Sequence, residues 1–516
     1  MAASINSPWT ILAIGVLLFV SKCLYRIYFH PLRHIPGPTL AAVTHLEEFY
    51  YDVIRGGKFI WRIQEMHKQY GPIVRINPRE VHITDPSFYD EIYAGAGRKR
   101  NKDCHMTPIF ASPSATIATI DHDLHRTRRN QLNGFFSKKA VTELMPVIQS
   151  KVVHLQTILH KAYASDQAVN LHEIFASLSA DIITHYAYGS DCGFLDNPSE
   201  SNLILKGAHE IIQACHVHRF FPQVLTVLQV VPPWILRRVR PNLSGIFDMQ
   251  DRITQQSNDS LRQVAKHEAL ASDYRPRRTI FDAINDPALP PQERTLQRLR
   301  EEAFTVLGAA TETTEGALTI AMFHLLYHKP YFLRLREELR AVMPDSTDTA
   351  IWQDLERLPF LTGVVNESLR LSGISIRLPR VAPQETLHYH EHVIPAGTPM
   401  STISYFIHTN STIFPEPEKF DPDRWIRAAA PATQGSGASP QKLTKFLVPF
   451  TRGSRILAYA ELYMTLAAVV RRFDLELYGT TVEDVRFERD LSLPHTDRGA
   501  RRVRVRVVGL ARNIAE

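Results

Sequence analysis

The sequence predicts a mainly α-helical protein with a small β region, preceded by one membrane-spanning helix. Helical periodicity extends over most of residues 141–278 and over a long segment from Thr295 to about Tyr327. Two short runs of alternating polarity lie between Ile73 and Ile83, on either side of a turn, and are typical of paired strands. The apolar stretch from Trp9 to Phe29 has the composition of a transmembrane helix.

The stretch from Trp9 to Phe29 is interrupted only by Lys22 and Arg26. As a helix it would measure about 31 Å, close to the thickness of the hydrocarbon core. A cleaved signal peptide is the alternative, but no basic residue precedes Trp9 and no small-residue cleavage site follows Val20. The positive downstream flank places the following domain in the cytosol. We therefore expect residues 1–30 to be a membrane anchor and residues 31–516 to form the folded domain.

The next segment, His30–Pro38, contains three prolines and a glycine and predicts a stiff, extended connector. The composition beyond it is that of a globular protein, with 44% hydrophobic and 22% charged residues. A net charge of +6 suits an anionic membrane surface or an acidic protein, but a merely solvated surface is the default interpretation; we expect no nucleic-acid partner. The four cysteines include no CxxC pair, which argues for reduced thiols and against a zinc site.

The predicted helix from Thr295 has polar residues at its centre, in the run Ala-Ala-Thr-Glu-Thr-Thr from Ala309 to Thr314. An acid followed by a hydroxyl, Glu312 and Thr313, is costly in a buried apolar helix unless both groups are used or satisfied. One interpretation is that both groups are used by the protein. The alternative is that the hydroxyls bond back to carbonyls one turn earlier, a common habit of threonine within a helix.

Basic residues at helical spacing mark the segment from Asp121 to Ser137. His125 and Arg129 are four residues apart, so both project from one face of a helix. A basic surface helix is the alternative interpretation.

The sequence Glu367-Ser-Leu-Arg370 places an acid and a base on neighbouring turns of one helix. The same spacing occurs at Glu337–Arg340 and Glu483–Arg486, which are better interpreted as exposed ion pairs worth under about 1 kcal/mol. Glu367 differs because it follows Leu-Pro-Phe-Leu and precedes the segment Phe420–Trp425.

Three histidines, His388, His390 and His392, alternate along a predicted strand. They could bind a transition metal. No carboxylate or cysteine spacing supports such a site, so a solvated hairpin edge is the preferred interpretation and we predict no metal bound by protein side chains there.

The segment Phe-Leu-Val-Pro-Phe-Thr-Arg-Gly-Ser-Arg, from Phe446 to Arg455, is followed at once by a helix-like run from Ile456 to Phe473. Its second half resembles the haem-binding loop of cytochromes P450, F-x-x-G-x-R-x-C-x-G. Four other patterns of that family occur in the same order along the whole chain. They are H-x-x-x-R at His125, the acid–hydroxyl helix motif at Glu312, E-x-x-R at Glu367 and F-x-P-x-R-W ending at Trp425. The chain looks closest to fungal P450s of secondary metabolism, a group that includes trichodiene oxygenases.

The resemblance implies a mainly helical fold with a small sheet and with haem between two long helices. The reaction would insert one oxygen atom into an apolar small molecule, with electrons from NADPH–cytochrome P450 reductase at the endoplasmic reticulum membrane. In the family, residues matching Glu312 and Thr313 relay protons during oxygen activation. Residues matching His125, Arg129, Arg380 and Arg455 bind the haem propionates. Those matching Glu367, Arg370 and Arg424 form a buried cluster that locks the haem-binding loop.

The chain departs from the family pattern directly after Arg455. Ile456, Leu457 and Ala458 stand where the family has its axial cysteine and the following glycine, and the loop is shorter by about five residues. Tyr459 is the nearest substitute ligand, although it falls within the following helix, and Cys104 matches the opposite side of the family's pocket. Either the sequence lacks a few codons of a haem-thiolate monooxygenase, or the chain is a non-catalytic, membrane-anchored P450-like protein.

Overall fold

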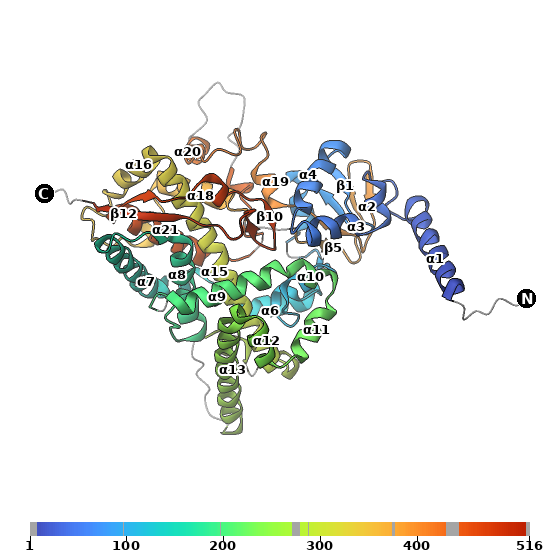
Figure 1. The fold of residues 1–516 in the computed structure, drawn as a ribbon, viewed down its shortest axis with the longest axis horizontal. Coiled ribbons are helices and arrows are strands. Elements are labelled where there is room, and N and C mark those ends of the chain that lie inside the picture. The colour runs from blue at the N-terminus through green and yellow to red at the C-terminus, as the bar shows by residue number, and fades with distance from the viewer. Residues whose placement is uncertain are drawn as a thin grey trace, which may run out of the picture.

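The computed structural model describes residues 8–511 except residues 96, 197, 271–278, 287, 374–376, 430–442 and 452. Helices make up most of this described chain, and its short strands form four small sheets (Figure 1). The predicted mainly α-helical fold with a small β region is confirmed. The last part of the predicted helical region, residues 271–278, lies outside the described residues.

Helix α1 (Pro8–Tyr28) stands away from the body of the protein (Figure 1). It has 21 residues, a mean hydropathy of 1.8 over 18 of them, and no buried residue. Its length and composition are those of a membrane-spanning helix, as the sequence predicts.

The connector after α1 is not extended, contrary to the prediction. It is folded into turns, in which the amide of Arg33 donates to the carbonyl of His30 (3.0 Å) and that of Ile35 to the carbonyl of Leu32 (3.1 Å). Leu32 and Ile35 are buried in an apolar cluster with strand residues. Packing against the sheet thus overrides the extended preference that the prolines suggest.

The helices range from single turns to the 32 residues of α15 (Leu296–Tyr327). The other long helices are α7 (Lys138–Ala164), α8 (Leu171–Tyr188), α9 (Pro198–Gln213), α13 (Ser244–Leu270), α18 (Pro359–Leu371) and α21 (Ile456–Arg472). The shorter helices are α2 (Thr39–Val43), α3 (Leu46–Phe49), α4 (Phe59–Tyr70), α5 (Tyr89–Ile92), α6 (His122–Asn133), α10 (Cys215–Phe220), α11 (Gln223–Val230), α12 (Pro233–Val239), α14 (Ile280–Ile284), α16 (Lys329–Leu339), α17 (Trp352–Leu355), α19 (Ser404–His408) and α20 (Asp423–Ala429).

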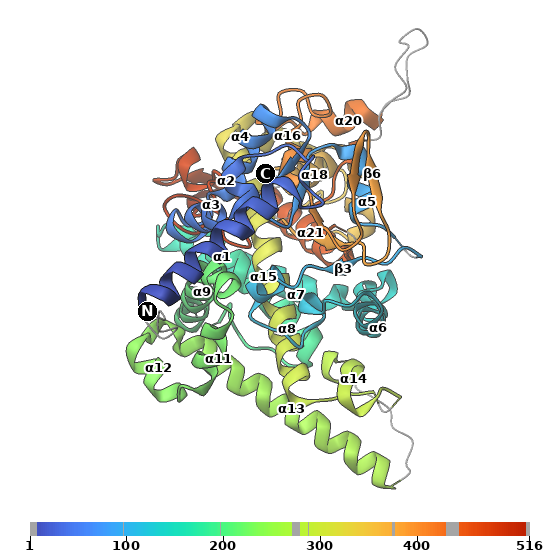
Figure 2. The ribbon, with the colours of Figure 1, turned by 90° about the vertical axis from the view of Figure 1, so that its right-hand side faces the viewer.

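Helix α15 runs through the middle of the molecule, as Figure 2 shows. It begins after Thr295, whose side chain caps the helix by accepting a hydrogen bond from the amide of Arg298 (3.3 Å), and it ends at Tyr327. These ends match the prediction. The helix packs against α8, α13, α18 and α21, and the second half of it is almost entirely buried. An apolar helix of this length needs such neighbours on all sides.

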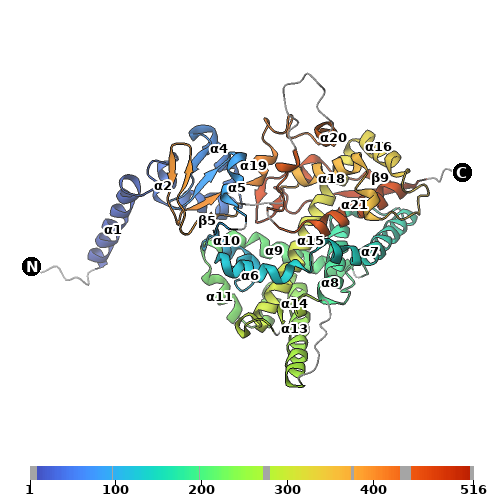
Figure 3. The ribbon, with the colours of Figure 1, turned by 180° about the vertical axis from the view of Figure 1, so that it is seen from behind.

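The sheets are small, and most of them pair strands that are far apart in the sequence. The strands are β1 (Ile73–Arg75), β2 (Val81–Ile83), β3 (Asn101–Lys102), β4 (Val169–Asn170), β5 (Arg380–Val381), β6 (Leu387–Tyr389), β7 (His392–Ile394), β8 (Pro399–Ser401), β9 (Phe473–Leu477), β10 (Arg489–Asp490), β11 (Pro494–His495) and β12 (Arg504–Leu510). The largest sheet has the order β1-β2-β8-β5-β3 and lies at the end of the molecule next to α1 (Figures 1 and 3). The predicted pair of strands within it, β1 and β2, is antiparallel, as expected for a tight turn.

Glu461 of α21 is an isolated acid in the helical core. Its side chain is 1% exposed and accepts a hydrogen bond from Ser179 Oγ of α8 (2.7 Å). Burial raises the pKa of the Glu461 carboxyl to about 8. The folded protein therefore binds this proton more tightly than the unfolded chain does, so the contribution to stability is full below pH 4.5 and is lost as the pH rises through 8.

We expect Glu461→Gln to flatten this pH dependence, because the amide keeps the shape of the neutral acid. The variant should match the parent protein near pH 4 and exceed it in free energy of unfolding above pH 8, by a few kcal/mol. Urea unfolding across this pH range measures the difference. Parallel curves for parent and variant would show that Glu461 does not titrate in the folded protein.

Candidate functional site

The face of α15 around Ala309 is accessible, although the helix runs through the core. Gly308 and Ala309 are exposed, whereas the residues from Thr314 to Phe323 are buried. A Cβ atom added to Gly308 would meet no atom within 4 Å. Thr313 Oγ1 donates to the carbonyl of Ala309 (2.8 Å), so this hydroxyl is satisfied within the helix, as the structural alternative expected.

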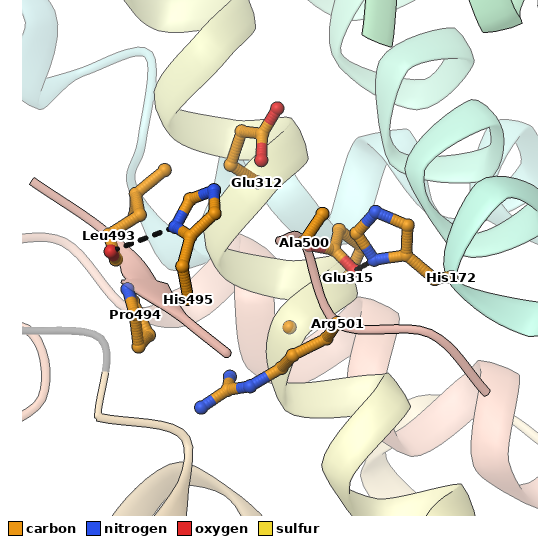
Figure 4. A pocket seen from close by; sticks show the side chains of 9 residues that line it. His172, Glu312, Glu315, Leu493, Pro494, His495, Ala500 and Arg501 are labelled. Carbon is orange, nitrogen blue, oxygen red and sulfur yellow. Dashed lines mark hydrogen bonds and ion pairs between the residues drawn. The ribbon is translucent and has the colours of Figure 1, made fainter. Parts of the chain in front are cut away.

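Glu312 is one of the residues that line a small cavity between α15, α8 and the C-terminal segment (Figure 4). The cavity has a volume of about 20 Å³, enough for one water molecule. Its polar lining consists of His172, Glu312, Glu315, His495 and Arg501. Burial, and then the nearby carboxylate of Glu315, raise the pKa of Glu312 to about 7. Glu312 can therefore exchange a proton near neutral pH.

An ion pair lies beside Glu312 in the same cavity. His172 Nδ1 lies 2.6 Å from Glu315 Oε2. Burial alone would lower the pKa of His172, but the Glu315 carboxylate raises it above its ordinary value. Burial lowers the pKa of Arg501 to about 10, and its guanidinium donates to the carbonyl of Ser372 (2.7 Å). The sequence singled out neither His172 nor Glu315, because the pair joins two helices far apart in the chain.

His125, Arg129 and Arg380 come together in the structure with a further basic residue, Lys102. His125 and Arg129 belong to α6, while Lys102 on β3 pairs directly across the sheet with Arg380 on β5. Lys102 Nζ donates to the carbonyls of Thr116 (2.8 Å) and Ile117 (2.6 Å). Arg380 Nη1 donates to the carbonyls of Leu378 (3.1 Å) and Pro379 (3.4 Å). We call these four residues the cationic cluster.

The charges of the cationic cluster repel one another. Burial, and then the charges of Lys102, Arg380 and Arg129, lower the pKa of His125 to about 3. Burial and Arg380 lower the pKa of Lys102 to about 7. Glu302 of α15 opposes the shifts of Lys102 and Arg129, but its Oε2 also accepts hydrogen bonds from the amide and hydroxyl of Thr116 (both 2.7 Å). The cluster therefore favours binding of an additional anion.

Arg455, the remaining predicted cofactor-binding residue, belongs neither to α6 nor to β5, the elements that carry the other three. It is exposed and occupies the position before the first residue of α21. The segment before it is held in part by the amide of Val448, which donates to His408 Nε2 (3.0 Å).

Tyr459, the nearest substitute for an axial cysteine, is engaged within the protein. It lies in α21, and its hydroxyl is 3.3 Å from Asn366 Oδ1. Burial raises the pKa of Tyr459 to about 12, which disfavours the phenolate that a metal would require. Cys104 is exposed, between β3 and α6.

Glu367, Arg370 and Arg424 form one fully buried group. Arg370 donates to Glu367 through Nε (2.9 Å) and Nη2 (2.7 Å), and Arg424 Nε donates to Glu367 Oε1 (3.0 Å). Trp425 Nε1 adds a bond to Glu367 Oε2 (2.9 Å). The two guanidinium groups also donate to the carbonyls of His408, Pro415, Glu416, Pro417 and Lys419. The group thus ties α18 and α20 to the chain between residues 408 and 419.

The other candidates from the sequence are surface features. Glu337 and Arg340 form an exposed ion pair (2.5 Å). His388 and His390 are exposed, on and beside β6, and His392 begins β7 of the same hairpin. No group of three or more metal-ligating side chains occurs in the part of the chain that the structure describes.

Comparison with known proteins identifies the family. The family model for cytochrome P450 matches residues 37–498. The chain belongs to the cytochrome P450 family. The relatives of this P450 include conidiogenone synthase PchP450 of Penicillium rubens, which is 42% identical over 90% of this chain and 91% of its own length.

Two further relatives of this P450 are named as monooxygenases. TRI4 of Fusarium sporotrichioides is 42% identical over 91% of this chain and 89% of its own length. The relative aflU of Aspergillus parasiticus is 40% identical over 98% of this chain and 99% of its own length. The resemblance to fungal P450s of secondary metabolism, drawn from the motifs, is thereby confirmed. By family, this P450 is an oxidoreductase of the monooxygenase type.

Proposed function

We propose that the fold is that of a haem-dependent monooxygenase acting on an apolar small molecule of fungal secondary metabolism. The named activities of the relatives support the reaction class. The cationic cluster supports the cofactor, because it offers an anion site to the propionates. In this proposal His125, Arg129, Arg380 and Arg455 bind the propionates, and Glu312 and Thr313 belong to the proton supply. Glu367, Arg370 and Arg424 hold the segment before α21.

The axial side does not match a haem-thiolate site, and we propose that the chain as given is catalytically inactive. The cysteines of the whole chain are Cys23, Cys104, Cys192 and Cys215, so none follows residue 215. Helix α21 begins at Ile456, directly after Arg455. In P450s a cysteine thiolate on the iron favours O–O cleavage. The cationic cluster therefore suits the propionates of haem, but the segment before α21 lacks the cysteine that would bind the iron.

The decisive experiment is the spectrum of the purified chain, reconstituted with haem, reduced and exposed to carbon monoxide. We expect no Soret band of the thiolate type, because the polypeptide supplies no axial sulfur. A clear thiolate band would refute the proposal that the chain is catalytically inactive. Sequencing the transcript across the codons for Arg455 and Ile456 tests the origin: a continuous message without a cysteine codon would rule out a missing exon segment.

We further propose that residues 1–30 anchor the protein in the endoplasmic reticulum membrane and that residues 31–516 form a cytosolic domain. Lys22 and Arg26 at the downstream end of α1 support this orientation. Exposed apolar side chains next to α1, Leu40 and Leu46, suit contact with lipid. The proposed electron donor is NADPH–cytochrome P450 reductase, and the proposed substrate is an apolar small molecule.

A further inference from the structure

Two arginines join the C-terminal end of α1 to the body of the protein. Arg75 of β1 donates from Nη1 to the carbonyl of Arg26, which lies in the last turn of α1 (3.0 Å). The guanidinium of Arg26 in turn donates to the carbonyl of Val43, the last residue of α2. The charge of Arg26 also lowers the pKa of Arg75, so the two guanidinium groups lie close enough to repel each other.

The charge of Arg75 is buried and forms no ion pair with a carboxylate among the described residues. Arg75 is 2% exposed, and its hydrogen bonds go to the carbonyls of Arg26 and Pro78 (2.9 Å from Nη2 to the latter). Its Nε has no hydrogen-bond partner in the part of the chain that the structure describes. A buried charge is costly unless it is paired. An anion beside the two arginines would lower this cost.

His30 is the third basic residue at this junction. Its Nδ1 accepts a hydrogen bond from the amide of Leu32 (3.1 Å), so the proton of the neutral ring lies on Nε2, which is a donor. Burial, and then the charges of Arg75 and Arg26, lower the pKa of His30 and keep the ring neutral at neutral pH. The junction therefore combines two guanidinium groups with one neutral donor. We call Arg26, His30 and Arg75 the junction site.

The length of α1 places the junction site at the surface of a bilayer. The helix has 21 residues, which is about 31 Å and close to the thickness of the hydrocarbon core. When the helix spans the membrane, its last turn and the residues beyond it lie among the lipid head groups. A lipid phosphate is the anion that the bilayer itself holds at this depth.

We propose that the junction site binds the phosphate of one anionic phospholipid. The contact with Val43 uses one nitrogen of Arg26 and leaves the other donors of its guanidinium, in the described structure, for phosphate oxygens. The phosphate would offset the repulsion between Arg26 and Arg75 and would fix α1 against the folded domain. The inference rests on the proposed membrane anchor but not on haem binding or oxygenation.

Native mass spectrometry of the full chain in detergent tests the inference by counting bound lipids. We expect one phosphatidylglycerol to bind at least about tenfold more tightly than phosphatidylcholine with the same acyl chains, because the ammonium of the latter offsets its phosphate. Glycerol phosphate is the soluble source of the same group and should bind more weakly than phosphatidylglycerol. Equal affinities for the two lipids would overturn the inference. Equal affinities for glycerol phosphate and phosphatidylglycerol would assign the site to a soluble phosphate and overturn it too.

Two variants of Arg75 separate its charge from its structural hydrogen bonds. Arg75→Gln removes the charge and keeps a donor for the neighbouring carbonyls, so it should weaken phosphatidylglycerol binding about tenfold. Arg75→Lys keeps the charge and should weaken binding by less than about threefold. Equal weakening in both variants would contradict a role of the charge in binding.

Arg26→Met makes the same test without changing a buried residue, and it should also weaken phosphatidylglycerol binding about tenfold. Arg33→Met is the matched control, because Arg33 is exposed in the same connector and its loss changes the net charge equally. We expect less than about a twofold effect there. Similar losses in Arg26→Met and Arg33→Met would indicate general attraction to anionic lipid and would contradict a specific site.

Failure of the proposed anchor is distinguishable from failure of the junction site. Washing membranes that contain the parent chain with alkaline carbonate tests the anchor, and release of the chain would refute it. The lipid count is made in detergent and does not require insertion into a bilayer. Retention of the chain together with equal affinities for the two lipids would refute the junction site and leave the anchor in place.

Discussion

Insertion of Cys-Ala-Gly-Ala-Ala after Ile456 is expected to convert the haem-loaded chain into one with a thiolate-type Soret band under carbon monoxide. The insertion restores the family's R-x-C-x-G spacing after Arg455 and lengthens the loop by the five residues by which it is short. The segment before α21 and the Glu367 group are already present, so the new thiolate would be added to an otherwise formed site. Reduced absorption spectra of purified protein measure the change.

The matched control is the same insertion with serine in place of cysteine. It has the same length and the same glycine, so it separates the effect of the sulfur from the effect of the longer loop. We expect the serine form to resemble the parent chain. A thiolate band in the serine form, or no band in the cysteine form despite bound haem, would contradict the assignment of Phe446–Arg455 as the loop beneath the iron.

Glu367→Ala is expected to cause the largest loss of stability of any single change considered. Removal of this carboxylate leaves Arg370 and Arg424 without the acid that both of them contact, although Arg370 is 0% and Arg424 5% exposed. Breaking a buried pair in this way costs about 3–5 kcal/mol, because uncompensated charge stays buried. Urea unfolding at neutral pH measures the loss.

Glu337→Ala provides the control for that experiment. Glu337 and Arg340 have the same spacing as Glu367 and Arg370, but their ion pair is exposed. We expect a change below about 1 kcal/mol there. If both alanine variants lost a similar free energy of unfolding, burial would not explain the contribution of the Glu367 group to stability.

The sequence was sufficient to predict features that depend on local pattern. Helix α15 was predicted with both ends, because its apolar residues recur with helical spacing over more than thirty positions. Helix α1 was also predicted, from the length of its apolar stretch, and so was the strand pair β1 and β2, from the alternation of polar and apolar residues. The connector after α1 was not, because its turns depend on burial of Leu32 and Ile35 against strands that come later in the chain.

Features that depend on contacts between distant parts of the chain could not be predicted from the sequence. Lys102 and Arg380 are far apart in the chain and become neighbours only through the pairing of β3 with β5, two strands of two residues each. Such short strands have no detectable alternation. Similarly, the ion pair of His172 with Glu315 exists because α8 packs on α15. Three segments of the chain match the spacing E-x-x-R, and the order of the motifs along the chain indicated that Glu367 is the one in the buried group. Only the structure shows which residues Glu367 contacts.

The repulsion between Lys102 and Arg380 has a consequence for the stability of the protein. A protein that is strained when empty gains stability from whatever neutralises the strain, by an amount that rises with the concentration of the free ligand. The free energy of unfolding of the chain should therefore rise as the concentration of an anionic ligand for the cationic cluster rises.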